Sequence, residues 1–358
     1  RGFKAMKKAI TIKSIAEELN LSRNTVSKAL NGQYVPKKTR EIVLKKAQEL
    51  NYKSLSLKNA EMSDKKYHIL LVSTRPLNSI NYFISLVSSI ENYCYERNYE
   101  LFQYIYNSRE SNFKRLSAYI KELNVDGIVA IECFDKEFIS KLLQLDIPVC
   151  FHDFAHTSQS FIQTYDVVCT NDEQAVSSFI KSLYKKYKST RFTFVGDNRH
   201  CQSFRKRYTG MLLGLRNSKI PHNPSDDINL SEENFDYGNI MALKEEISKI
   251  NPLPEVFVCC NDFVARNVCF ALKSMRIAVP ENALVVGFDN AAESYSLSPA
   301  LTTFSIDRQF LGAEIMRVLI DRIENKSIPT RFITISTSLI VRQSTEREGT
   351  TDNPIKKG

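Results

Sequence analysis

The chain from Tyr67 to Asp289 alternates short apolar runs with amphipathic stretches, and the alternation occurs as two successive series. The first series contains HILLVS, ELFQYIY, DGIVAIE and IPVCFHD, and the second contains VVCTN, RFTFVGD, EVFVCCND and ALVVGFD. Runs rich in Ile, Val and Phe that are separated by single helices predict parallel strands joined by helical crossovers. We therefore predict two α/β lobes, each built on a doubly wound parallel sheet.

The positive charge of the chain is concentrated ahead of these lobes. Residues 1–66 contain 16 of the 49 Lys and Arg residues but only 6 of the 40 Asp and Glu residues, a net charge of +10. The other 292 residues have a net charge of −1. A basic segment on an electrically neutral body predicts a part that binds a polyanion such as nucleic acid.

Composition also bears on the compartment. No run of about 18 apolar residues is present, which predicts no membrane-spanning helix. The basic N-terminus is not followed by the apolar run of a secretory signal, because Lys13, Glu17 and Glu18 interrupt it. The 8 cysteines show no C-x-x-C spacing, and most lie in strand-like text, which favours buried, reduced thiols. We expect a cytoplasmic protein associated with the nucleoid, without membrane partners, cofactors or bound metal.

The basic segment has the pattern of three short helices. Thr11 is a suitable N-cap for the first, Asn20 can end it in a tight turn, Ser22 is a strong N-cap for the second, and Pro36 suits the start of the third. Two short helices joined by such a turn are the helix-turn-helix arrangement, whose second helix enters the DNA major groove. The apolar residues expected to form the common core are Ile12, Ile15, Ala16, Leu19, Leu21, Val26, Ala29, Leu30, Ile42, Val43, Ala47 and Leu50.

The text from Thr11 to Tyr52, and above all IKSIAEELNLSRNTVSKALN and TREIVLKKAQELNY, resembles the headpiece of the lactose-repressor/galactose-repressor family of bacterial transcription regulators. The resemblance implies that Arg23, Asn24 and Lys28 read bases. Lys lacks the planar fork of the Arg found in many relatives, so we expect looser discrimination at Lys28. The other expected DNA-binding positions are Thr11 and Ser22 at the helix starts and, for contacts with the DNA backbone, Thr25, Ser27, Asn31, Tyr34 and Thr39.

The segment that follows departs from the family. Relatives continue with a hinge helix that inserts a leucine into the minor groove, whereas this chain reads KSLSLKNAEMSDKKYH. The position of that leucine falls on Glu61, which phosphates repel. Met62 can insert after a shift of one residue, since Met is among the common minor-groove wedges. The alternative is a flexible linker without ordered minor-groove contact.

Polar residues follow several of the predicted strands of the lobes. They are Asp153, Asp197, Asn261 with Asp262, and Asp289 with Asn290, and Arg207 lies early in a helix. Ligands of doubly wound sheets bind beyond the carboxyl ends of the strands. Carboxylates, amides and an Arg fork suit vicinal hydroxyl groups, and an aromatic ring from Phe83, Phe204 or Phe288 can cover the apolar face of a sugar. His152 and His156 lack a third ligand for a metal site.

The second half resembles the same family, whose regulatory region is similar to periplasmic sugar-binding proteins. The matching text is SFRKRYTGMLLGL, VFVCCNDFVARNVCFALKSMRIAVPENALVVGFDN and LTTFSIDRQFLGAEIMRVLIDRI. By position, Arg207, Asn261 and Asp289 match effector-contacting residues, Asp153 is a further candidate, and Phe83 and Phe288 are the expected aromatic contacts. The resemblance implies crossings between the lobes near Asp166, Phe304 and Ser336. The implied organisation is a headpiece at 6–52, a hinge at 53–66, lobe 1 at 67–166 with 305–336, lobe 2 at 167–304 with 337–347, and a tail at 348–358.

Two rival functions are weaker. An enzyme is disfavoured because the chain contains no G-x-G-x-x-G, no phosphate-binding G-x-x-x-x-G-K, no G-x-S-x-G and no H-E-x-x-H. A solute-binding protein would account for the lobes but not for the basic helical segment. We therefore expect a homodimeric transcriptional regulator, a repressor, which binds a pseudopalindromic operator and responds to a small molecule, a sugar by family analogy, in the cleft between the lobes.

Overall fold

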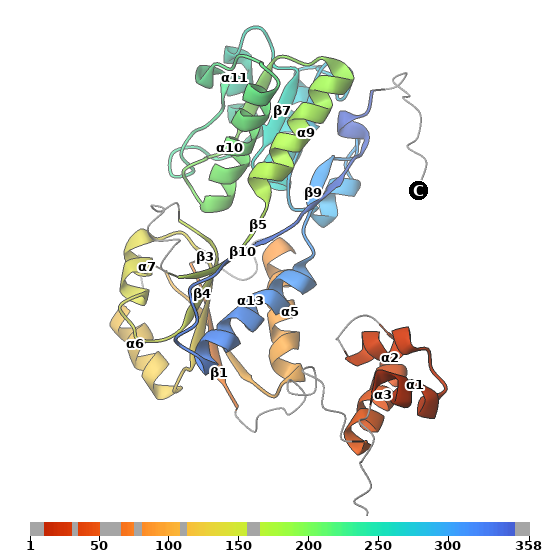
Figure 1. The fold of residues 1–358 in the computed structure, drawn as a ribbon. Helices are drawn as coiled ribbons and strands as arrows, with labels where there is room; N and C mark the ends of the chain where they lie inside the picture. Colours follow the sequence, from red (N-terminus) through yellow and green to blue (C-terminus); the bar gives the residue numbers. More distant parts are fainter. Residues whose placement is uncertain are drawn as a thin grey trace, which may run out of the picture. The chain divides into compact units, whose positions relative to one another are not determined.

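A computed structural model describes residues 11–30, 35–50, 66–74, 81–107, 113–155 and 165–347. The chain forms two compact units, Arg1–Lys66 and Tyr67–Gly358. The described residues of the first unit, the headpiece, form three helices: α1 (Ile12–Leu19), α2 (Arg23–Leu30) and α3 (Lys37–Glu49). The second unit, the body, has two α/β lobes (Figure 1). The helical headpiece and the two-lobed body that the sequence predicted are thus confirmed.

The helix boundaries of the headpiece follow from its capping residues. Thr11 and Ser14 form a reciprocal capping box at the start of α1, with Thr11 N 2.8 Å from Ser14 Oγ. Asn20 ends α1 in the left-handed conformation, with φ of 52°. Ser22 Oγ accepts the Thr25 amide at 3.0 Å. These bonds satisfy backbone amides that would otherwise lack partners at the helix starts.

Seven side chains form the buried core of the headpiece: Ile15, Ala16, Val26, Ala29, Leu30, Val43 and Ala47. Ile12, Leu19, Leu21 and Leu50 pack around them while partly buried. The prediction was wrong for Ile42, which is 53% exposed. Val43 and Ala47 are four residues apart and define the buried stripe of α3, so Ile42 points about 100° away from it.

The first lobe is a six-stranded parallel sheet with strand order β10-β5-β4-β3-β1-β2. Helices α5 and α13 cover one face, and α6 and α7 cover the other (Figure 1). Every residue of β3 is buried, as expected for a central strand covered on both sides. The bounds are β1 His68–Ser73, α5 Asn81–Glu96, β2 Glu100–Ile105, α6 Phe113–Glu122, β3 Gly127–Cys133, α7 Lys136–Leu142, β4 Val149–Phe154, β5 Asp166–Thr170, α13 Arg308–Glu324 and β10 Phe332–Ile335.

The second lobe is built on a smaller parallel sheet with strand order β6-β7-β8. An antiparallel pair, β9 with β11, accompanies it. The bounds are α9 Asp172–Tyr187, β6 Phe192–Val195, α10 Gln202–Asn217, η1 Pro224–Asp226, α11 Ile240–Lys249, β7 Val256–Cys259, α12 Asp262–Ser274, β8 Leu284–Val286, η2 Ala292–Tyr295, β9 Thr303–Ser305, β11 Ser338–Ile340 and η3 Gln343–Thr345.

The chain passes between the lobes at three places, which are after β5, after β9 and after β10. We placed the first crossing near Asp166, but Asp166 begins β5 and pairs with Cys150 of β4, so the chain leaves this sheet only after Thr170. Asp166 is held in the first lobe by Arg322, whose Nε and Nη2 donate to its carboxylate at 2.8 and 3.1 Å. The strand extends beyond the predicted boundary because β5 pairs with β10 as far as Thr170.

Candidate functional site

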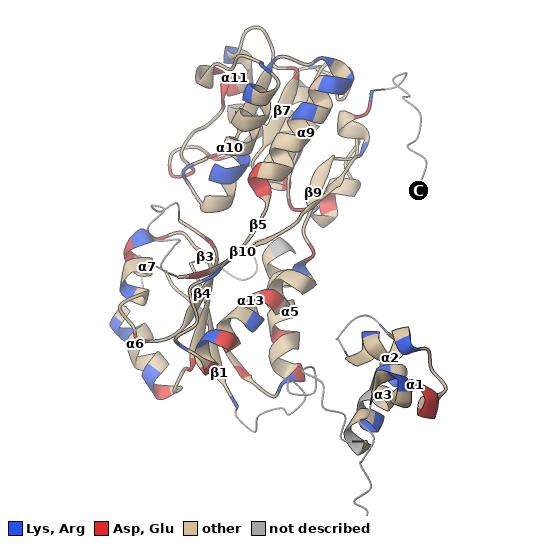
Figure 2. Ribbon diagram, viewed as in Figure 1, with Lys and Arg blue, Asp and Glu red and all other residues tan. Residues whose placement is uncertain are grey.

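The predicted base-reading residues lie on one helix of the headpiece. Arg23 and Asn24 are the first two residues of α2, Lys28 lies one turn further, and all three side chains are exposed. Among the described residues, neither Arg23 nor Lys28 has an acidic partner, whereas Lys13 and Lys46 pair with Glu17 and Glu18 at 3.7 and 3.5 Å. In Figure 2 the Lys and Arg residues of the headpiece helices are coloured blue. Arg23 and Lys28 can therefore meet phosphates or base edges without first breaking an ion pair.

The other predicted DNA-binding residues differ in how exposed their side chains are. Thr11 and Ser22 are exposed, but their hydroxyl groups cap α1 and α2. Thr25, Ser27 and Thr39 are partly buried. Three predicted positions, Asn31, Tyr34 and Met62, lie outside the described residues, as does most of the hinge segment.

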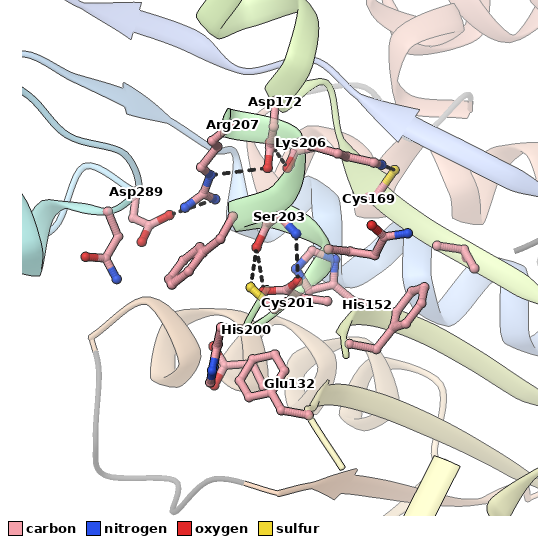
Figure 3. A pocket seen from close by; sticks show the side chains of 18 of the residues that line it. Glu132, His152, Cys169, Asp172, His200, Cys201, Ser203, Lys206, Arg207 and Asp289 are labelled. Atoms are coloured by element: carbon pink, nitrogen blue, oxygen red, sulfur yellow. Dashed lines mark hydrogen bonds and ion pairs between the residues drawn. The ribbon is translucent and has the colours of Figure 1, made fainter. Parts of the chain in front are cut away.

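A pocket lies between the two lobes of the body, and Figure 3 shows it from close by. Phe134, which follows β3, and Asp153 of β4 contribute from the first lobe, and Asn261 and Asp289 contribute from the second. The lining residues are Glu132, Phe134, His152, Asp153, Phe154, Val167, Cys169, Thr170, Asp172, His200, Cys201, Gln202, Ser203, Phe204, Lys206, Arg207, Asn261, Asp289 and Phe332. Several of these residues follow the carboxyl ends of parallel strands, which is where ligands of such sheets bind.

Asp153 bridges the two lobes. It lies in β4 with φ of 44°, a left-handed conformation that is uncommon for a residue with a side chain. Its Oδ1 accepts the backbone amide of Ser203 at 3.2 Å, and its Oδ2 accepts the Ser203 hydroxyl at 2.7 Å. Ser203 lies in the first turn of α10, where exposed amides favour a carboxylate. Asp153 is thus engaged by protein groups of the opposite lobe.

Arg207 is the centre of the polar groups in the second lobe. Its Nε donates to Asp172 Oδ2 at 3.2 Å, its Nη1 to the Cys260 carbonyl at 2.6 Å, and its Nη2 to Asp289 Oδ1 at 3.3 Å. The guanidinium carbon lies 3.7 Å from the ring centroid of Phe288. This combination of ion pairs, a carbonyl bond and stacking fixes the plane of the guanidinium group.

The electrostatics of the pocket follow from burial. Burial raises the pKa of Asp289 to about 7, because the loss of water outweighs the attraction of Arg207. Burial lowers the pKa of His152, so its ring is neutral at pH 7, and its Nδ1 lies 2.8 Å from the Val168 carbonyl oxygen. Burial also opposes the charge of Arg207, but Asp172 and Asp289 outweigh it and raise the pKa of Arg207. The guanidinium group therefore stays charged.

The structure brings four of the six predicted effector residues to the pocket: Asp153, Arg207, Asn261 and Asp289. The side chain of Asn261 also caps α12 by accepting the Val264 amide at 2.9 Å. Phe83 and Phe288 do not line the pocket. Each is 1% exposed, Phe83 in the core of the first lobe and Phe288 beneath Arg207. A ring that follows an apolar pattern fills the core more readily than it faces a solvent-filled cleft.

Two other residues singled out at strand ends stabilise loops instead of lining the pocket. Asp197 accepts the amides of Arg199 and Glu232 at 3.0 and 3.2 Å. Asp262 accepts the Thr303 hydroxyl at 2.6 Å and the Ala291 amide at 2.8 Å. A carboxylate after a strand can thus serve either the ligand or the loop that follows, and the sequence alone does not distinguish these roles.

Sequence reasoning missed Asp172 and Ser203. Asp172 follows the run VVCTN directly, so the same strand-end argument that selected Asp153 and Asp289 would have found it. No comparable signal marked Ser203, because a serine in the first turn of a helix is common. Within the described part of the chain, no three His, Cys, Asp or Glu side chains are grouped as ligands for a metal ion. None of the described helices is long and apolar enough to span a bilayer.

Comparisons with known proteins agree with this architecture. Residues 184–345 match the periplasmic binding protein-like domain. The chain is 26% identical to the HTH-type transcriptional repressor PurR of Vibrio parahaemolyticus, over 94% of this chain and 99% of that protein. It is also 26% identical to the HTH-type transcriptional repressor PurR of Haemophilus influenzae, over 93% of this chain and 98% of that protein.

Solved structures share the fold along nearly the whole chain. The transcriptional regulator CelR in complex with cellobiose has a TM-score of 0.68 at 18% identity, over 94% of this chain and 99% of that one. The lac repressor dimer bound to operator and an anti-inducer has a TM-score of 0.64 at 19% identity, with the same coverage. The helix-turn-helix headpiece, the two-lobed body and the relatives matched over almost their full length together support a transcriptional regulator of the lactose-repressor/galactose-repressor family.

Proposed function

We propose that this regulator binds a pseudopalindromic operator as a homodimer, represses transcription there, and responds to a small molecule in the pocket between its lobes. The observation that carries the proposal is the exposed set Arg23, Asn24 and Lys28 at the start of a helix-turn-helix recognition helix. Two such helices related by a two-fold axis would read two half-sites. The naming of the full-length relatives as repressors favours repression over activation.

A sugar is the effector class that we propose. The pocket offers carboxylates, an amide and the Arg207 fork together with the rings of Phe134, Phe204 and Phe332, which suits a molecule with hydroxyl groups and an apolar face. Structures with the same fold are described with cellobiose, D-xylulofuranose or ribose. Binding accounts for these side chains without a chemical step, so the proposal includes no catalysis.

The effector would act by changing how the two headpieces of the dimer meet the operator. It would shift the balance between two arrangements of the lobes, and the coupling equals its difference in affinity for the two arrangements, typically about 1–3 kcal/mol. A headpiece at 6–52, a hinge or linker at 53–66, and a site of action on the nucleoid in the cytoplasm complete the proposal. A solute-binding protein is the rival function, and the headpiece argues against it.

Replacing Arg23 with alanine tests base reading. We expect the preference at one operator position to relax by about 1–3 kcal/mol, because a side chain that contacts a base edge discriminates between base pairs. The measurement is fluorescence anisotropy on an operator selected in vitro and on its single-base variants. Lys45→Ala, which removes an exposed charge from α3, is the control and should leave the preference unchanged. An equal loss on every DNA would make Arg23 a phosphate contact only.

Replacing Asp289 with alanine tests the pocket. We expect operator affinity without effector to stay unchanged and the effector response to be lost, because Asp289 lies in the pocket beside Arg207. A thermal-shift screen of common sugars first identifies a ligand, since a molecule that binds only the folded state raises the Tm. Operator affinity is then measured with and without that ligand. Asp197→Asn, which follows β6 of the same sheet but lies outside the pocket, is the control. A normal response of Asp289→Ala would refute the assignment.

A further inference from the structure

Asp172 is the first residue of α9 and lies where the chain enters the second lobe. Its side chain is 1% exposed. One carboxylate oxygen accepts Arg207 Nε at 3.2 Å, and the other accepts the hydroxyl group of Thr170. The preceding residue, Asn171, accepts the amide and the hydroxyl group of Thr337 at 2.8 and 3.0 Å, which joins this position to another crossing segment. Asp172 is therefore held firmly before any effector binds.

The contacts of Arg207 show what this carboxylate does. An Arg side chain has five N–H groups in a rigid plane. Three of them donate to described protein groups, namely Asp172, the Cys260 carbonyl and Asp289, and Phe288 stacks against the plane (Figure 3 labels Asp172, Arg207 and Asp289). Asp172 accepts the Nε–H group, whereas Cys260 and Asp289 accept the Nη1 and Nη2 groups. Asp172 is thus the buried charged partner that holds the Nε position of the plane.

We propose that Asp172 is a positioning residue of the effector site, which holds the Arg207 guanidinium so that its remaining N–H groups and the Asp289 carboxylate meet adjacent hydroxyl groups of a polyol effector. This inference rests on the proposed function, because it concerns the same pocket. Fixing polar groups before binding reduces the conformational entropy that is lost on binding. Asp172 thereby contributes to affinity without being required to contact the effector.

The charge of Asp172 has a second consequence. Arg207 divides its attraction between two carboxylates, so Asp289 is only partly compensated, and burial raises the pKa of Asp289 to about 7. The charged groups that act on Asp289 are Arg207 of α10, Asp262 of α12, Arg308 of α13 and Asp172 of α9. Without the charge of Asp172, which repels the Asp289 carboxylate, the pKa of Asp289 falls.

The test compares the full-length protein with Asp172→Asn, an isosteric change that keeps the shape and one acceptor but removes the charge. Asp307→Asn, at the start of α13, is the matched control for the loss of a carboxylate at a helix N-terminus. Binding of D-ribose, D-xylulose and cellobiose is measured by calorimetry from pH 5.5 to 8.5. For any sugar that binds, we expect its affinity for the unmodified protein to rise by about tenfold between pH 5.5 and 8.5, because Asp289 ionises over this range.

Asp172→Asn should bind that sugar about tenfold more weakly at pH 8, because Arg207 loses its ion pair with Asp172 and is held less firmly in the plane that meets the effector. Its binding should also depend less on pH over this range, because the pKa of Asp289 is lower without the charge of Asp172. A role limited to helix stability would not flatten the pH profile. Unchanged affinity and an unchanged profile in Asp172→Asn would overturn the proposal.

A measurement without ligand decides the case in which none of the three sugars binds. That case counts against a sugar effector but not against the role of Asp172. The pKa of Asp289 in the folded protein, about 7, lies above its unfolded value of about 3.9. The contribution of Asp289 to the free energy of unfolding therefore falls as pH rises from about 4 to 7, and it is constant above pH 7. Relative to Asp289→Asn, the Tm of the unmodified protein should fall from pH 5 to 7.

The same experiment is done with Asp172→Asn, for which the double variant Asp172→Asn with Asp289→Asn is the reference. Its fall in Tm from pH 5 to 7 should be clearly smaller than that of the unmodified protein, and an equal fall would refute the proposal. Circular dichroism checks that each variant folds. If Asp172→Asn fails to fold, Asp172→Glu takes its place. It keeps the charge but shifts the carboxylate, so it should weaken sugar binding and leave the fall in Tm close to that of the unmodified protein. Sugar binding as tight as that of the unmodified protein would overturn the proposal.

Discussion

Replacing Arg207 with methionine will lower the free energy of unfolding of the body by about 3–5 kcal/mol, because the change leaves a buried carboxylate without its cation. The side chain of Asp172 is 1% exposed and that of Arg207 is 6% exposed, so water cannot replace the lost partner. Asp289 can respond by binding a proton, since its pKa is already raised to about 7. Asp172 is left with the hydroxyl group of Thr170. The measurement is chemical denaturation at pH 7, followed by circular dichroism.

Two further variants make this result specific. Arg205→Met, on the exposed side of the same helix, should change the free energy of unfolding by less than about 0.5 kcal/mol. Combining Arg207→Met with Asp172→Asn should recover much of the loss, because replacing both members of a buried ion pair costs far less than removing one. If Arg207→Met alone proves no more harmful than Arg205→Met, the ion pair described here is not formed in solution.

Raising the salt concentration from 50 to 200 mM will weaken operator binding by a factor on the order of 10³–10⁵, if the dimer neutralises about 6–10 phosphates. The reason is the distribution of charge, with a net charge of +10 in residues 1–66 and −1 in the other 292 residues. Each phosphate contact releases condensed counterions, so affinity falls linearly on a double-logarithmic plot. Titrations at four or more salt concentrations give the slope.

The body supplies an internal comparison for the salt experiment. It has almost no net charge, so binding of an uncharged sugar in its pocket should change little over the same range of salt. Lys28→Gln should reduce the steepness of the operator slope by about one if Lys28 contacts a phosphate, and by less if it reads a base. A slope near zero for the unmodified protein would contradict DNA binding through the basic headpiece.

The sequence predicted the fold and part of the pocket because both depend on repeating patterns. Apolar runs between helices predict parallel strands, and the carboxyl ends of such strands meet at one edge. This rule placed Asp153, Asn261 and Asp289 correctly at the pocket edge. It also selected Asp197, because a carboxylate that holds a loop occupies the same place in the pattern.

The sequence could not predict which groups already bind one another. Phe288 follows a strand, but its ring lies beneath Arg207, a contact between residues 81 positions apart in the chain. Asp172 has the pattern of an ordinary helix start, and its pairing with Arg207 depends on how α9 and α10 pack. Ile42 of α3 is a further example, because it is exposed although the next residue, Val43, is buried. A shift of one position around a helix is enough to separate a core residue from an exposed one.

The three crossing segments restrict how the lobes can move. The chain crosses after β5, after β9 and after β10, and β9 pairs with β11 by antiparallel bonds close to two of these crossings. This ladder ties two of the three crossing segments together where they join the second lobe. A change in backbone dihedrals at one of them is therefore transmitted to the other, and the two lobes should rotate about all three crossings together. A molecule bound in the pocket would then set the angle between the lobes.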